Sequence, residues 1–165
     1  MNTIPNIFLF LHPAFGLFSI LSAVWLFVET INANEANKKR IDIAAFNVVG
    51  WMLFAWIAGG QWYVVFYPAE KAMILKGAWP FAHSFFMEVK EHMFFIPLIL
   101  ALYLPIVAVR NSLHINDVAR KMVMTLSLLI IVISLFIEGA GAVITQGAKI
   151  SYHQACTVEV QNDAE

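Results

Sequence analysis

The most regular feature of the sequence is the alternation of long apolar stretches with short polar runs. Four apolar stretches lie at about residues 5–28, 42–66, 84–109 and 122–145. Each is close to the roughly 20 residues that an α-helix needs to cross a hydrocarbon layer about 30 Å thick. The pattern predicts an all-α fold, a four-helix transmembrane bundle that forms a single integral membrane domain over residues 1–165, with a short polar tail at residues 146–165.

The composition supports the same class of protein. Hydrophobic residues make up 61% of the chain and charged residues 13%, whereas soluble domains have about 45–50% and about 25%. The single Cys156 excludes an intrachain disulfide framework, and a net charge of −1 without a basic stripe excludes nucleic acid as a partner. We therefore expect a multi-pass protein whose main partner is the lipid bilayer, in a bacterial or archaeal plasma membrane.

The joints between the apolar stretches differ in charge, and this difference predicts the orientation. Lys and Arg are concentrated in the joints at residues 29–41 and 110–121, and few lie in the joint at residues 67–82. The positive-inside rule places the two basic joints in the cytoplasm and both termini outside. No Lys or Arg precedes the first stretch, so we expect it to be a retained span rather than a signal peptide. In the outer joint, Pro68 and Pro80 bracket a short amphipathic turn expected to lie along the membrane surface. Tyr67, with Trp62, Tyr63 and Trp79, is expected to form an aromatic belt at the outer boundary.

Three ionisable residues are predicted to lie at one depth. His12, His92 and Glu138 are 17, 18 and 17 residues from the charged residue at the cytoplasmic end of their helix, which corresponds to roughly 25–27 Å. Gln61 lies within about one further turn, and Glu88 stacks on His92 because residues four apart share a helix face. Each such group costs about 2.5–3.5 kcal/mol at the bilayer centre on insertion scales, so a function is expected of them.

A haem between the first and third spans is the leading hypothesis. These spans run parallel, so His12 and His92 are expected to face each other as axial ligands, with Gly16 on a small-residue stripe that admits a flat cofactor. In span count, ligand placement and glycine-lined faces the chain resembles small four-helix membrane cytochromes of the b type, although it lacks the repeated His pairs of the two-haem versions. The resemblance implies an electron-transfer subunit that binds one haem b near the outer face, surrounded by Gln61, Glu88 and Glu138.

Such a subunit would exchange electrons with a carrier or with other membrane subunits, and within an enzyme it would be a membrane-anchored oxidoreductase subunit. Two other chemistries fit the same residues. A non-haem metal would use His12, His92, Glu88, Glu138 and His83 as a mixed imidazole and carboxylate shell. A quinol pocket would use a histidine and a carboxylate as proton acceptors.

The residues also have structural explanations. A position of the His12 side chain in the headgroup region explains this residue as well as ligation does. Lys90 is expected to extend its apolar stem toward the interface, and His83 and Glu88 are expected to cap the third span. Under these interpretations the chain is a cofactor-free accessory subunit of a larger membrane complex. Its polar residues would then fix the register of the helices.

Overall fold

The computed structural model describes residues 3–162, and the side chains of residues 7–157. Within this part of the chain every regular element is a helix, as predicted. The elements are α1 (Thr3–Ile31), the 3₁₀ turn η1 (Glu35–Asn37), α2 (Lys38–Val65), α3 (Tyr67–Lys76), the π-helix η2 (Ala82–Met87), α4 (Glu88–Met93), α5 (Phe95–Arg110) and α6 (Asp117–Asn162). The four predicted apolar stretches are helical except at Phe66, which follows α2, and at Phe94, which separates α4 from α5.

Four segments are long and apolar enough to cross a membrane. They are Ile7–Ile31, Glu35–Val65, Ala82–Arg110 and Asp117–Thr157. Large apolar side chains lie exposed along all of them, as expected for helices that face lipid rather than water. The fold is thus an all-helical chain with four helices of membrane-spanning length and composition.

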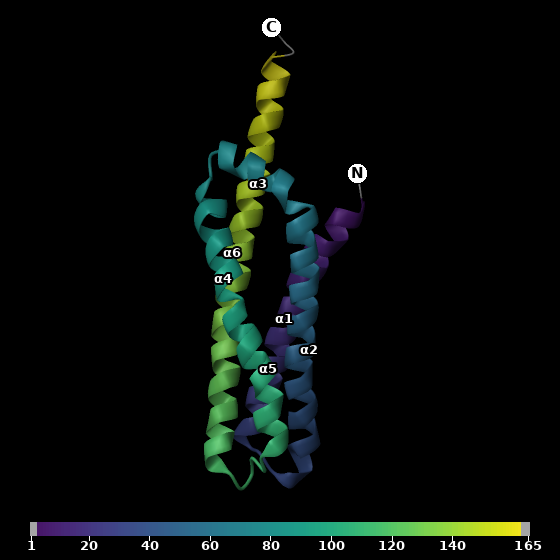
Figure 1. The fold of residues 1–165 in the computed structure, drawn as a ribbon, viewed down its shortest axis with the longest axis vertical. Helices are drawn as coiled ribbons and strands as arrows, with labels where there is room; N and C mark the ends of the chain where they lie inside the picture. Colours follow the sequence, from purple (N-terminus) through teal and green to yellow (C-terminus); the bar gives the residue numbers. More distant parts are fainter. Residues whose placement is uncertain (1–2, 163–165) are drawn as a thin grey trace.

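The long helices run side by side in one elongated bundle (Figure 1). α1 packs against α2 and α6, and α5 packs against the same two helices, so the four form a closed ring. The start of α1 and the end of α6 lie at the same end of the bundle, which we call the terminal end, and α3 crosses the bundle there (Figure 1). The opposite end, where the turns at residues 32–37 and 111–116 lie, is called the loop end. The surface turn predicted between Pro68 and Pro80 is the helix α3.

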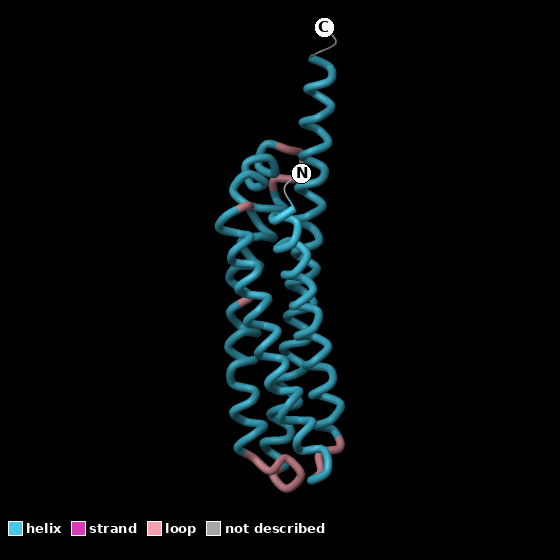
Figure 2. The backbone as a smooth tube through the Cα atoms, turned by 90° about the vertical axis from the view of Figure 1, so that its right-hand side faces the viewer, coloured by secondary structure: helices cyan, strands magenta, loops and turns pink. Residues whose placement is uncertain are grey.

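The last helix is longer than the sequence pattern indicated. α6 has 46 residues and continues to Asn162, through most of the segment expected to be a polar tail. Its final turns extend past the other helices (Figure 2). Hydropathy predicted where the apolar segment ends, but polarity alone does not stop a helix that contains no proline.

The third span is the least regular of the four. It begins as the π-helix η2, continues as the six residues of α4, is interrupted at Phe94 and resumes as α5. Pro97 explains the interruption, because it has no N–H to donate to the carbonyl of Met93. α4 packs mainly against α6, η2 and α5, so this short segment has a break at each end.

At the loop end, a capping box joins α1 to α2. The Asn34 N–H donates to Asn37 Oδ1 at 2.8 Å, and the Asn37 N–H donates to Asn34 Oδ1 at 3.1 Å. The Asn37 side chain is buried, and its Nδ2 also donates to the carbonyl and carboxylate oxygens of Glu29, both at 3.0 Å. Arg40 Nε binds the same carboxylate at 3.0 Å.

We expect Asn37→Ala to lower the free energy of unfolding by about 1–2 kcal/mol, because several capping bonds are lost together. Thermal unfolding of the purified protein in detergent measures this loss. Asn32→Ala is the matched control, since the exposed Asn32 side chain lies outside the capping box. Equal losses in the two variants would contradict the role assigned to Asn37.

The buried apolar side chains form two separate clusters. The larger one, in the loop half, includes Leu26, Val48, Leu104 and Ile130. The smaller one, at the terminal end, is built around Tyr67 and includes Ile74, Ala82, Met87 and Ile144. The polar residues described next lie between them.

Candidate functional site: a polar layer between two apolar cores

His12 is held in one orientation by the neighbouring helix. Its Nδ1 is 2.8 Å from the carbonyl oxygen of Ala55 on α2. Ser19 Oγ donates to the Val48 carbonyl at 3.0 Å, and seven residues separate the two bonds on each helix, so both follow the same antiparallel register. A carbonyl oxygen only accepts, so Nδ1 carries the proton of the neutral ring and Nε2 is its acceptor nitrogen.

Three ionisable side chains of this layer each lie against a glycine of another helix. The ring of His12 lies over Gly59 of α2, where an added Cβ would be 2.5 Å from Nδ1. The Glu138 carboxylate lies in contact with the position of a Cβ on Gly16 of α1, and Lys90 Nζ would be 2.9 Å from a Cβ on Gly141 of α6. We call these three contacts the glycine seats.

The three glycine seats lie where α1, α2, α4 and α6 contact one another, and they include the opposite charges of Lys90 and Glu138. Lys90 and Glu138 attract each other, and Lys90 also acts electrostatically on His12. Lys90 and Glu138 make no direct ion pair, so the attraction acts across a short gap. Ionisable groups in such a position are stabilised by each other and by the backbone dipoles they face.

A narrow cavity opens beside His12 and Glu138. It has a volume of about 10 Å³, enough for a single water molecule. Its lining is formed by His12, Gly16, Met52, Ala55, Phe94, Ser134, Ile137 and Glu138. The hydroxyl of Ser134 is buried and has no hydrogen-bond partner. A buried hydroxyl without a partner indicates a place for a water molecule or a polar ligand.

The structure brings His12, Gly16 and Glu138 to this cavity but leaves the other expected ligands elsewhere. His92 is exposed on α4, and its Nδ1 is 2.7 Å from the carbonyl oxygen of Glu88 on its own helix. Gln61 is exposed on α2, and the Glu88 side chain is 51% exposed. Glu88 and His92 are thus both exposed on α4, four residues apart, and neither they nor Gln61 line the cavity.

The structure does not bring His12 and His92 together. The two imidazoles do not share a cavity, since His12 lines the space of about 10 Å³ beside Glu138 and His92 is exposed on α4. In the described part of the chain, no three His, Cys, Asp or Glu side chains are grouped closely enough to hold a metal ion.

His83 belongs to a second polar cluster, at the terminal end. Its ring is 4% exposed rather than directed to water, and its Nδ1 is 3.0 Å from the hydroxyl oxygen of Tyr67. Burial, reinforced by Tyr63, Glu70 and Glu91, raises the pKa of Tyr67 above its usual range, so the hydroxyl keeps its proton at neutral pH.

Sequence reasoning placed two of these residues differently. Lys90 was expected to extend toward the interface, and Tyr67 to contribute to an aromatic belt. Lys90 instead lies over Gly141, and Tyr67 is 1% exposed. The small-residue positions on α6 were a usable signal for Lys90, since a glycine on an inward face accommodates a long side chain from a neighbour.

Together the fold and this layer define a class: a helical bundle with four helices able to cross a membrane and an ionisable cluster inside it. No protein-family model, curated protein or solved structure matches this chain.

Proposed function

We propose that this chain is a multi-pass membrane subunit that binds the headgroup of a quinol-type molecule in the cavity between α1 and α6. The observation that carries the proposal is the unpartnered Ser134 hydroxyl facing the same cavity as His12 and Glu138. A quinol headgroup is an aromatic ring with hydroxyl groups that donate and accept hydrogen bonds, which matches a lining of mixed polar and apolar side chains.

The polar residues supply suitable partners for such hydroxyl groups. Neutral His12, with Nδ1 bonded to Ala55, offers Nε2 as an acceptor, and the Glu138 carboxylate offers two acceptor oxygens. The Ser134 hydroxyl can donate to an oxygen of the ligand. Met52 and Phe94 supply apolar contacts to a ring.

The irregular third span provides a way for the cavity to widen. A ring needs more room than a single water molecule, so a helix must move when the headgroup binds. α4 is six residues long and is bounded by the π-helix η2 and by the break at Phe94. Helix irregularities of this kind frequently mark functional positions. Phe94 lines the cavity at the break between α4 and α5, so we expect the chain to move at this break.

The test is direct binding of a short-chain benzoquinol to the full chain in lipid nanodiscs, measured by calorimetry. We expect Ser134→Ala to weaken binding by about 3- to 10-fold, the effect of one lost hydrogen bond. Ser127→Ala is the matched control, because Ser127 is buried on the same helix and bonds the Val123 carbonyl at 2.8 Å.

Absence of binding to the native chain, or equal weakening in both serine variants, would contradict the proposal. The oxidised and reduced absorption spectra of the purified protein address the haem hypothesis separately. A Soret band lost in His12→Ala would favour the haem over the quinol.

A second candidate is a cofactor-free accessory subunit, favoured by the free end of α6. The side chains of residues 152–157 on this helix are exposed, Tyr152 by 59%. A helix that extends past its own bundle has a surface available to another subunit. Purification from native membranes with mild detergent would separate the candidates, since an accessory subunit is expected to migrate with its complex and to bind no quinol.

A further inference from the structure

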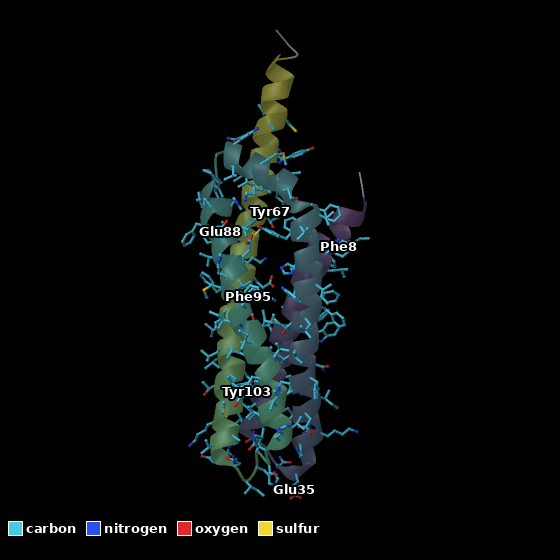
Figure 3. The ribbon with its side chains drawn as sticks, viewed as in Figure 1. Phe8, Glu35, Tyr67, Glu88, Phe95 and Tyr103 are labelled. Atoms are coloured by element: carbon cyan, nitrogen blue, oxygen red, sulfur yellow. The ribbon has the colours of Figure 1, made fainter. Side chains whose placement is uncertain are left out.

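The second polar cluster lies between the cavity and the surface at the terminal end. Tyr67 and His83 are bonded, and His83 Nε2 is 4.0 Å from Glu88 Oε1. Glu88 is half exposed, so the cluster runs from a buried tyrosine to a carboxylate in contact with the surroundings. Figure 3 shows Tyr67 and Glu88 near the same height at this end, with Phe95 deeper in the bundle.

Glu91 gives an independent indication that this cluster has a role beyond packing. Its Oε1 is buried and has no hydrogen-bond partner. The carboxylate lies close enough to the Tyr63 hydroxyl to accept a hydrogen bond from it, and it acts on the Tyr67 hydroxyl electrostatically. A buried carboxylate oxygen without a partner is expensive unless a proton or a water molecule occupies it.

α4 connects this cluster to the cavity. Glu88 and Glu91 are three residues apart and share one face of the helix, beside Tyr67 and His83. Lys90, the neighbour of Glu91, extends over Gly141 toward Glu138. One short helix thus carries ionisable groups of both clusters.

On the other side of the cavity the interior is apolar. The loop-half core contains Leu26, Met52, Leu98 and Ile130, among other aliphatic residues. The buried hydroxyl groups of this half belong to Ser19, Ser22, Thr30 and Ser127, and all are bonded to backbone carbonyls. Among the described residues, ionisable groups therefore continue from the cavity toward the terminal end, whereas in the other direction the buried carboxylate oxygen without a hydrogen-bond partner is that of Asp42, at the loop end beyond this apolar core.

We propose that Glu91, Tyr67, His83 and Glu88 form a proton path that connects Glu138 and the cavity to water at the terminal end. The path rests on the proposed function, because it gives the protons of a bound quinol-type hydroxyl a route to one side only. Each transfer breaks one O–H or N–H bond and forms another, and the chain gains or loses no electrons. Gaps such as the 4.0 Å between His83 and Glu88 are bridged by water.

The protonation of Glu138 reports on this path. The ionisable groups that face Glu138 are His12 from α1 and Lys90 from α4. α5 contributes no carboxylate or imidazole, since its titratable residues are Tyr103 and Arg110. A hydrophobic carbodiimide modifies protonated carboxyl groups in membranes, so its rate of reaction with Glu138 measures how often that carboxyl is protonated.

The experiment uses the full chain in oriented lipid vesicles with a different pH on each side, and mass spectrometry to quantify modified Glu138. In the native chain the rate should follow the pH at the terminal side, by up to tenfold for each pH unit. Tyr67→Phe and Glu91→Gln should each reduce this response to well below tenfold for each pH unit, because Glu138 then no longer exchanges protons with the terminal side in preference to the loop side. Tyr103→Phe and Glu35→Gln are matched controls at the loop half, labelled in Figure 3.

A rate that follows the pH of the loop side, or an unchanged response in Tyr67→Phe and Glu91→Gln, would overturn the path. Benzoquinol binding is measured on the same variants. Retained binding with an unchanged pH response refutes the path alone, whereas loss of binding by the native chain refutes the proposed function.

Discussion

Gly59→Ala is expected to lower the free energy of unfolding by about 1–3 kcal/mol, the usual cost of forcing extra volume into a packed interior. The new Cβ would lie 2.5 Å from Nδ1 and 2.7 Å from Cε1 of His12. The imidazole is a rigid ring bonded to the Ala55 carbonyl, so it can move only by losing that bond. The loss is measured by thermal or denaturant unfolding in detergent.

The adjacent Gly60 is the matched control for this prediction. A Cβ on Gly60 meets nothing within 4 Å, and the residue is exposed on the same helix. Gly60→Ala should therefore leave stability unchanged or raise it by about 0.5–1 kcal/mol, because alanine favours the helix. Similar effects in the two variants would contradict the glycine seat under His12.

Lys90→Met is expected to lower the free energy of unfolding by about 1–2 kcal/mol, less than the roughly 3–5 kcal/mol of a buried pair in direct contact, because Lys90 and Glu138 attract each other without forming an ion pair. Methionine keeps the apolar stem but leaves the Glu138 carboxylate facing Gly16 and His12 without an opposite charge nearby. Denaturant unfolding of the purified protein measures the loss.

A double-mutant cycle makes this prediction specific. Adding Glu138→Gln to Lys90→Met removes the uncompensated charge and should recover most of the lost stability. Glu35→Gln is a control, since Glu35 has an 89% exposed side chain at the loop end. Additive effects of Lys90→Met and Glu138→Gln would show that the two charges are not coupled.

The helices were predictable because length and hydropathy determine them. A run of about 20 apolar residues forms a helix wherever water is absent, and the four runs gave the four long segments. The turn between Pro68 and Pro80 was visible for a similar local reason, since proline favours the first turn of α3. The end of α6 was not predictable from hydropathy, because a polar segment can also form a helix and the drop in hydropathy therefore does not mark where the helix ends.

The directions of the side chains were much harder to predict. The number of residues along the helix predicts the depth of His92. The direction of its side chain can be predicted only if the whole span is a regular α-helix. η2 is a π-helix and α4 ends at Phe94, so the α-helical phase is not maintained through this span. His92 consequently faces outward, while Lys90, two residues earlier, faces α6.

The contacts between side chains of different helices depend on how each helix is rotated about its own axis relative to its neighbours. The periodicity of the sequence does not predict this rotation. His12 was expected to face His92 and instead bonds to the backbone of α2. Tyr67 and His83 come from separate segments, and their bond exists because α3 folds across the end of the bundle.

The length of α6 has a mechanical consequence. Its 46 residues rise about 69 Å at 1.5 Å per residue, whereas a whole bilayer with its headgroups measures about 40–45 Å. A helix of this length oriented along the bilayer normal stands roughly 25 Å clear of the lipid, a height comparable to the diameter of a small soluble domain. The extension would be rigid, so that tilting the bundle by a few degrees would displace the end of α6 laterally by several ångströms.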